Sequence, residues 1–349
     1  MKEFDQQIIT DNASLLDALV ALNSLCDRTL TLFVVDSDNH LVGTLTDGDI
    51  RRGLIKGYSL TDKVAVSMHK SFSFFYEQEK DKITKIKSIR QRGVKTIPVV
   101  DSEMHIVDVV NLLKFKSLLP VDAILMAGGK GERLRPLTER TPKPLLRVGN
   151  KSIIDYNVER LISYGVKHIS VTVNYLREQI EDHFSNPING IHVHCVREPE
   201  FLGTMGSVKF VKEFVNDTVL VMNSDLFTNI DFEDFYLHFK EHDADMSVAA
   251  VPYTVKVPYG IFDLDGRNIK GVLEKPTYNY FANAGIYLLK RSIIDSIPEG
   301  KFYNATDLMN SLITSGHKVV RFPIAGYWID IGNKEELAKA QELVKHTSL

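Results

Sequence analysis

The pattern of apolar and polar residues changes character once along this chain, near residue 120. Before that point, two short apolar runs separated by a polar turn and followed by a helix-like stretch occur twice, at residues 32–45 and 97–110. After it, apolar runs of strand length alternate with amphipathic stretches of helical period. The change predicts two domains, residues 1–119 and residues 120–349.

The first region is an internal repeat. The segment V-D-S-D-N-H-L-V at residues 35–42 recurs as V-D-S-E-M-H-I-V at residues 100–107, an offset of 65 residues. Each copy is predicted to end in a helix, and in the first copy Thr46 or Asp47 can cap it within G-T-L-T-D-G-D. Two copies of one supersecondary unit indicate a small α+β module.

The second region predicts an α/β fold. Strands are expected at residues 123–126, 168–173, 191–196, 219–222, 246–251, 269–273 and 319–329, and helices at residues 153–164, 176–183, 208–215, 232–242, 306–314 and 334–344. Strands that alternate with helices form a Rossmann-like, doubly wound and mostly parallel sheet, which binds ligands at the carboxyl ends of its strands.

Composition and charge exclude several partners. A net charge of −3 with scattered basic residues favours neither nucleic acid nor a membrane surface. No apolar run approaches the roughly 20 residues of a membrane span, and the N-terminus is polar and acidic rather than signal-like. The two cysteines, Cys26 and Cys195, lack metal-site spacing. We therefore expect a cytoplasmic protein.

The segment A-G-G-K-G-E-R-L-R at residues 127–135 is rich in glycine and cations. Leu134 stands where a dinucleotide fingerprint needs its third glycine, which disfavours a dehydrogenase, and no Gly-Lys-Ser/Thr of a Walker loop follows. Glycines leave backbone N–H groups free to approach a phosphate, and Lys130, Arg133, Arg135 and Lys143 add positive charge. The pattern favours a polyanion such as a triphosphate; the alternative is a glycine turn with ordinary surface cations.

The longer pattern G-G-x-G-x-R-L-x-P-L-T, followed by P-K-P, resembles the signature of sugar-phosphate nucleotidyltransferases. These enzymes make nucleotide sugars from a nucleoside triphosphate and a sugar 1-phosphate. The resemblance extends from residue 121 to about residue 344 through L-G-T-M-G (202–206), N-S-D (223–225), E-K-P (274–276), N-A-G-I-Y (283–287) and W-I-D-I-G (328–332).

The resemblance implies a role for each charged position. Arg133 would contact the leaving pyrophosphate, Lys143 the α-phosphate, and Asp225 with Asp330 one Mg²⁺ ion. The sugar phosphate is already an anionic nucleophile, so the reaction needs in-line positioning and charge neutralisation rather than a general base. The alternative for each aspartate is a turn or cap residue at a strand end.

The resemblance also implies two binding sets. The nucleotide set is Ala127, Gly128, Gly129, Gly131, Glu198, Gly203 and Thr204, and the sugar-phosphate set is Tyr259, Gly260, Glu274, Lys275 and Asn283. A carboxylate at Glu198 only accepts hydrogen bonds, which suits the two adjacent donors of guanine and favours GTP. UTP and dTTP remain alternatives, Glu198 could merely cap its loop, and Glu274 with Lys275 could be a surface ion pair.

The first region resembles a tandem pair of CBS domains. That resemblance implies that Thr46 and Asp49 hold the phosphate and ribose of an adenine or guanine nucleotide; helix capping alone is the alternative. The second copy has Asp108, Asn111 and Lys114 at the equivalent positions, so only one site is expected. We expect this module to regulate or assemble a homo-oligomer.

The combination of both regions resembles hexosamine-1-phosphate guanylyltransferases that carry CBS domains. The main competing interpretation is a non-catalytic nucleotide sensor that kept the fold and lost the chemistry. The presence of Arg133, Lys143, Asp225, Lys275 and Asp330 together argues against it.

Overall fold

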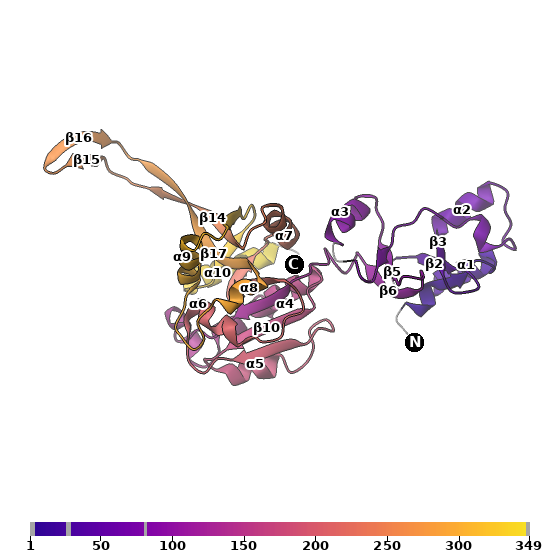
Figure 1. Ribbon diagram of the computed structural model, residues 1–349, viewed down its shortest axis with the longest axis horizontal. Coiled ribbons are helices and arrows are strands. Elements are labelled where there is room, and N and C mark those ends of the chain that lie inside the picture. Colours follow the sequence, from indigo (N-terminus) through magenta and orange to yellow (C-terminus); the bar gives the residue numbers. More distant parts are fainter. Residues whose placement is uncertain (1–3, 26–28, 80–81, 347–349) are drawn as a thin grey trace. The chain divides into compact units, whose positions relative to one another are not determined.

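The computed structural model describes residues 4–25, 29–79 and 82–346 and divides the chain into two compact units (Figure 1). The first unit is Met1–Leu118 and the second Leu119–Leu349, one residue from the boundary expected from sequence. Cys26 lies outside the described residues. No helix in the described part of the chain is long and apolar enough to cross a membrane.

The first unit consists of two similar three-stranded sheets. One contains β1 (Ile8–Thr10), β2 (Thr31–Val35) and β3 (Leu41–Thr46), and the other β4 (Phe75–Tyr76), β5 (Thr96–Val100) and β6 (Ile106–Asn111). In each sheet the first pair is parallel and the second antiparallel. The register shifts at the same step of both copies, Val34/Val35 and Val99/Val100, so the folded repeat follows the sequence repeat.

The helices of the two copies differ. The first copy has α1 (Leu15–Ser24) and α2 (Asp47–Ile55), whereas the second has α3 (Ile83–Gln91) and no helix after β6 among the described residues. The predicted final helix of the second copy is therefore wrong. Thr46 and Asp49 form a capping box that starts α2, but Asn111 accepts the Leu113 N–H at 2.9 Å and forms a local turn instead.

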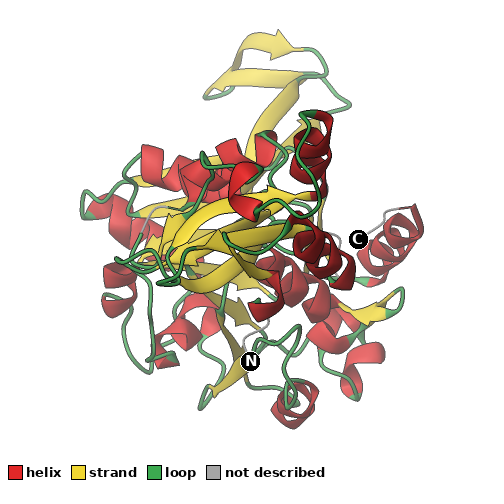
Figure 2. Cartoon of the chain, turned by 90° about the vertical axis from the view of Figure 1, so that its right-hand side faces the viewer, coloured by secondary structure: helices red, strands yellow, loops and turns green. Residues whose placement is uncertain are grey.

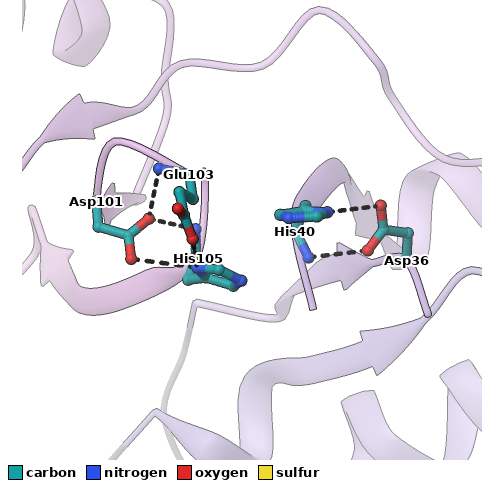
Figure 3. A network of polar contacts seen from close by, with 5 residues as sticks. All are labelled: Asp36, His40, Asp101, Glu103 and His105. Carbon is teal, nitrogen blue, oxygen red and sulfur yellow. Dashed lines mark hydrogen bonds and ion pairs between the residues drawn. The ribbon is translucent and has the colours of Figure 1, made fainter. Parts of the chain in front are cut away.

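The polar turns of the repeat meet each other (Figure 3). Asp36 accepts the backbone N–H of His40 and contacts its ring at 3.1 Å, and Asp101 does the same with His105 at 3.2 Å. These backbone hydrogen bonds hold the pKa of both aspartates below its usual range. The two imidazole rings lie 4.9 Å apart, so the most similar segment of the repeat forms the contact between its copies.

A seven-stranded sheet forms the centre of the second unit, in the order β11-β10-β7-β12-β17-β14-β18. All neighbours are parallel except β17, which is antiparallel to both β12 and β14. The strands are β7 (Asp122–Met126), β10 (His168–Val173), β11 (Val193–Arg197), β12 (Thr218–Asn223), β14 (Met246–Lys256), β17 (Thr277–Lys290) and β18 (Val319–Pro323). This arrangement confirms the predicted α/β fold with a mostly parallel sheet.

Helices cover both faces of this sheet (Figure 2). They are α4 (Ile153–Ser163), α5 (Arg177–His183), α6 (Gly203–Gly206), α7 (Phe232–Glu241), α8 (Arg291–Asp295), α9 (Ala305–Thr314) and α10 (Lys334–His346). The chain also forms the small hairpin of β8 (Arg147–Val148) and β9 (Lys151–Ser152). The central strands β7 and β12 are buried along almost their whole length, because apolar side chains of helices pack on both sides.

Two predicted elements of the second unit are wrong. The helix expected at residues 208–215 is only a 3₁₀ turn, Ser207–Phe210, because the buried Asp122 carboxylate accepts the N–H groups of Val215 and Asn216 and holds that segment extended. The strand expected at residues 319–329 is two strands. After β18 the chain leaves the sheet, and β19 (Trp328–Asp330) pairs antiparallel with β13 (Leu226–Thr228).

A long β-structured arm extends from the body of the second unit (Figure 1). We define the arm as residues 252–281: the outer halves of β14 and β17 together with β15 (Ile261–Asp265) and β16 (Asn268–Leu273). Its strands are paired only with each other, and most of its side chains are exposed.

Candidate active site

A cleft of about 630 Å³ opens at the carboxyl ends of β7 and β12. Parallel strands end at one edge of a sheet, so the segments that follow them meet there. All seven residues predicted to bind the nucleotide line this cleft, together with Arg133, Lys143 and Asp225. The structure thus brings together residues that lie far apart in the sequence.

Two glycines give the cleft its shape. A Cβ at Gly128 would lie 1.7 Å from Oε1 of Glu198, so only glycine lets that carboxyl group pack against the loop. Gly131 has a φ of +62°, and a Cβ there would approach Cβ of Lys143 to 3.1 Å. The loop backbone therefore sits directly against two side chains of the site.

Lys143 joins the two candidate metal ligands. Its ammonium donates to Oδ2 of Asp225 and lies 3.8 Å from Oδ1 of Asp330. The pairing of Leu226 with Asp330 between β13 and β19 brings the carboxylates together. Burial, together with the negative charge of Asp225, raises the pKa of Asp330. Two carboxylates around one ammonium leave a net negative charge.

This arrangement fits a divalent cation. Oδ1 of Asp225 is buried and has no hydrogen-bond partner among the residues that the structure describes. An unpaired buried carboxylate oxygen is unfavourable, and a hard cation that prefers oxygen ligands would satisfy it. Asp225 and Asp330 are therefore the residues that could hold Mg²⁺.

Arg133 supplies a further positive charge. It belongs to a 3₁₀ turn, Glu132–Leu134, and lines the cleft. Its positive charge opposes the rise in the pKa of Asp330, so the guanidinium acts electrostatically on that carboxylate. Lys130 is exposed and also lines the cleft.

Glu198 is a buried carboxyl group that packs against Gly128 of the glycine-rich loop. Only 2% of its surface is exposed, and its Oε2 accepts the Leu202 N–H at 3.3 Å. Burial raises the pKa of Glu198 to about 7. The side chain therefore changes charge near neutral pH.

A second cavity of about 290 Å³ shares Thr204 and Asn223 with the cleft and contains Asn283 and Asp330. Asn283 donates to the Tyr287 hydroxyl at 2.9 Å, which orients its amide. No lysine or arginine belongs to the described residues that line this cavity. We call it the side cavity.

Four predicted sugar-phosphate residues lie elsewhere. Tyr259 and Gly260 directly precede β15, and Glu274 and Lys275 directly follow β16, so all four belong to the arm. None of them lines the cleft or the side cavity. Within this single chain none of the four lines a cavity with Asn283, and their role stays a prediction.

Sequence reasoning missed two side chains of the site. Phe201 is 52% exposed yet lines the cleft, and only its place in E-P-E-F-L-G could have indicated it. Asn304 accepts the Thr204 N–H at 3.3 Å, and Thr204 in turn accepts the Ala305 N–H at 2.9 Å. The motif N-x-x-D at residues 304–307 indicates a helix cap but not a contact with a distant loop.

The first unit has its own cavity, of about 530 Å³. It is lined by Thr46, Asp47, Gly48 and His69 and by cationic side chains from both copies of the repeat: Arg51, Arg92 and Lys95. Asp49 does not line it, because its carboxylate accepts the Thr46 N–H at 2.9 Å and pairs with Arg52 at 2.6 Å. Both predicted ligand residues, Thr46 and Asp49, therefore cap α2, and Thr46 also lines the cavity.

Two family models match the chain, one within each unit. Residues 6–56 match the CBS domain family. The chain is 27% identical over 223 residues to the Xenopus tropicalis protein "Mannose-1-phosphate guanylyltransferase catalytic subunit beta", with 61% of this chain and 62% of that protein covered. The match thus spans less than two thirds of that relative's length.

Solved structures share the fold of the second unit. "Putative Glucose-1-Phosphate Thymidylyltransferase from Bacillus anthracis" matches with a TM-score of 0.54 at 24% identity, over 66% of this chain and 97% of that one. "HddC from Yersinia pseudotuberculosis complexed with GMP-PN" matches with a TM-score of 0.50 at 27% identity, over 64% and 99%. Residues 122–347 match the nucleotidyl transferase family, and the chain belongs to it.

Proposed function

We propose that the second unit transfers a nucleoside monophosphate from a nucleoside triphosphate, GTP by preference, to a hexose or hexosamine 1-phosphate. A sugar-phosphate oxygen forms a bond to the α-phosphorus, the bond to the β-phosphate breaks, and pyrophosphate leaves. The observation that carries this proposal is the meeting of Asp225 and Asp330 around Lys143, beside the glycine-rich loop.

The residues of the cleft act by position and charge. The loop N–H groups and Arg133 hold the β- and γ-phosphates, and Lys143 neutralises charge that develops at the α-phosphate. Nucleotidyltransferases of this type generally use a divalent metal. Mg²⁺ held by Asp225 and Asp330 would neutralise charge between the two mutually repelling anions.

Guanine preference is supported by Glu198. Its buried carboxylate can accept from both adjacent donors of guanine, whereas uracil and thymine present one donor between two acceptors. The relative named above as a mannose-1-phosphate guanylyltransferase and the solved structure with GMP-PN agree with this preference. Uridylyl or thymidylyl transfer is the alternative.

The decisive experiment is a panel of GTP, UTP, CTP, dTTP and ATP against mannose, glucose and hexosamine 1-phosphates, with released pyrophosphate as the readout. We expect the fastest release with GTP. Equal or faster release with another triphosphate would overturn the guanine preference. Nucleotide binding without pyrophosphate release from any pair would favour a non-catalytic sensor instead.

The raised pKa of Glu198 predicts a pH dependence of GTP binding. Below pH 7 the side chain is mostly neutral and loses one acceptor; above it the carboxylate meets both guanine donors. Affinity for GTP should therefore rise roughly tenfold between about pH 6 and pH 8, as the ionised fraction rises. Calorimetric titration measures this. Glu198→Gln, which cannot ionise, should show a flatter profile, and equal slopes in both proteins would contradict the prediction.

We also propose that the cavity of the first unit binds an adenine or guanine nucleotide. Arg51, Arg92 and Lys95 provide positive charge for its phosphates. At a hundredfold excess over Kd, a ligand selective for the native state adds roughly 2.7 kcal/mol of stability. Thermal unfolding of the full chain should show an upward shift of several degrees with at least one nucleotide.

Arg51→Ala should abolish that shift, because Arg51 lines the cavity on the exposed side of α2. Asp49→Ala is a poorer test, because losing the helix cap itself lowers stability by about 1 kcal/mol. Lys56→Ala, an exposed cation just after α2 and outside the cavity, is the control. An unchanged shift in Arg51→Ala would remove this cavity as the binding site.

A further inference from the structure

The arm exposes an unusual amount of apolar surface. Nine of its large apolar side chains are between half and three quarters exposed: Tyr253, Tyr259, Phe262, Leu264, Ile269, Val272, Leu273, Tyr280 and Phe281. Contiguous exposed apolar surface of this kind marks an interaction site in a folded protein.

Each face of the arm tip, which we define as the hairpin of β15 and β16, carries at least one apolar pair. Phe262 pairs with Val272, and the adjacent Ile261 pairs with Leu273, so the two pairs point to opposite faces of the ribbon. A two-stranded ribbon with no sheet or helix packed on either face is only marginally stable in water. The tip therefore needs a partner that covers it.

The arm also carries charged groups without partners. Glu274 and Lys275 make no ion pair or hydrogen bond among the described residues, and Lys275 has a φ of +44°. Such a backbone conformation is strained for a lysine and is typical of functional positions. The side cavity of the same chain, in contrast, has an acidic wall at Asp330 and no cation of its own.

The unpaired charges of the arm complement the side cavity, whose described lining contains no lysine or arginine. A second copy of this chain has the same arm and the same cavity, so each copy can offer its arm to the cavity of the other. We propose that two copies exchange arms, so that the arm of one copy packs on the body of the other and delivers Lys275 and Glu274 to its side cavity. There Lys275 binds the sugar phosphate and Glu274 accepts from sugar hydroxyls. The proposal rests on the proposed function, and the exchange is reciprocal, as expected for a twofold dimer.

Complementation between inactive chains tests the exchange. One chain carries Asp225→Asn and the other carries Glu274→Ala with Lys275→Ala. Each variant alone should lose most of its activity; for the arm variant we expect about tenfold to a hundredfold, as for a lost hydrogen bond to a charged group. Coexpression with two different affinity tags yields the mixed dimer.

In the mixed dimer, one site combines an intact body with an intact arm and the other has neither. We expect about half of the wild-type turnover per dimer. If each arm served its own chain, both sites would be defective, and activity no higher than that of the arm variant alone would overturn the proposal.

A second experiment does not depend on catalysis. Phe262→p-benzoylphenylalanine is placed in full-length chains, and ¹⁴N- and ¹⁵N-labelled populations are mixed, irradiated and analysed by mass spectrometry. We expect cross-links between differently labelled chains, to peptides that line the cleft or the side cavity. Cross-links only within one chain, or none, would overturn arm exchange even if the transferase activity is present. Conversely, these cross-links would support the exchange even if the transferase assay failed.

Ile313→p-benzoylphenylalanine is the matched control. Ile313 is 60% exposed, similar to Phe262 at 56%, but lies near the end of α9 on the body. It should give no more cross-linking between chains than random collision produces. Equal cross-linking from both positions would show non-specific association and would also overturn the proposal.

Discussion

Asp225→Asn is expected to lower turnover by about a thousandfold or more, because a metal that neutralises phosphate charge contributes several kcal/mol to the transition state. The change keeps the size of the side chain and removes its charge. It leaves Asp330 as the only carboxylate beside Lys143, so the pair of carboxylates that would hold the metal is lost. Steady-state pyrophosphate release at saturating substrates measures the loss.

Metal binding offers a readout without turnover. We expect Mg²⁺ to raise the thermal stability of the wild-type protein, since it would satisfy the buried Oδ1 of Asp225, and to leave Asp225→Asn unchanged. Asp182→Asn, an exposed carboxylate on α5, is the control for both measurements. Near-normal turnover of Asp225→Asn would refute its role in catalysis.

Lys143→Ala should lower turnover by on the order of a hundredfold or more, as for the loss of one preorganised donor. Proline on both sides restricts its backbone, and Gly131 packs against its Cβ, so the ammonium is held at the mouth of the cleft. The effect should fall on kcat more than on KM, because the charge it neutralises develops in the transition state. Arg135→Ala, an exposed cation outside the cleft lining, is the control.

The same variant should bind metal more tightly. The ammonium offsets part of the negative charge of the two carboxylates, and it therefore competes with a second cation at that position. Removing it should strengthen Mg²⁺ binding while turnover falls, the opposite of the result for Asp225→Asn. If metal binding weakened in both variants, Lys143 would have a structural role in assembling the ligands instead.

The local elements follow from short stretches of sequence, because their signals are short-range. The capping box of Thr46 and Asp49 and the glycine turn at Gly131 each involve neighbours along the chain, and each copy of the repeat is itself a short stretch. The alternation of strands and helices likewise predicts the sheet and the edge where ligands bind. The wrong predictions, such as the helix expected at residues 208–215, arise where a group that is distant in sequence, here the Asp122 carboxylate, accepts hydrogen bonds from the backbone.

Tertiary structure alone decided the contacts that give the site its chemistry. Asp225 and Asp330 meet only because β13 pairs with β19, after the chain leaves the main sheet, and no local pattern encodes that departure. The elevated pKa of Glu198 depends on burial under a loop that is distant in sequence. The separation of Lys275 from the side cavity likewise depends on how far the arm extends. Residue identity thus determined the available chemical groups, whereas non-local packing and desolvation determined which of them share a site and in what charge state.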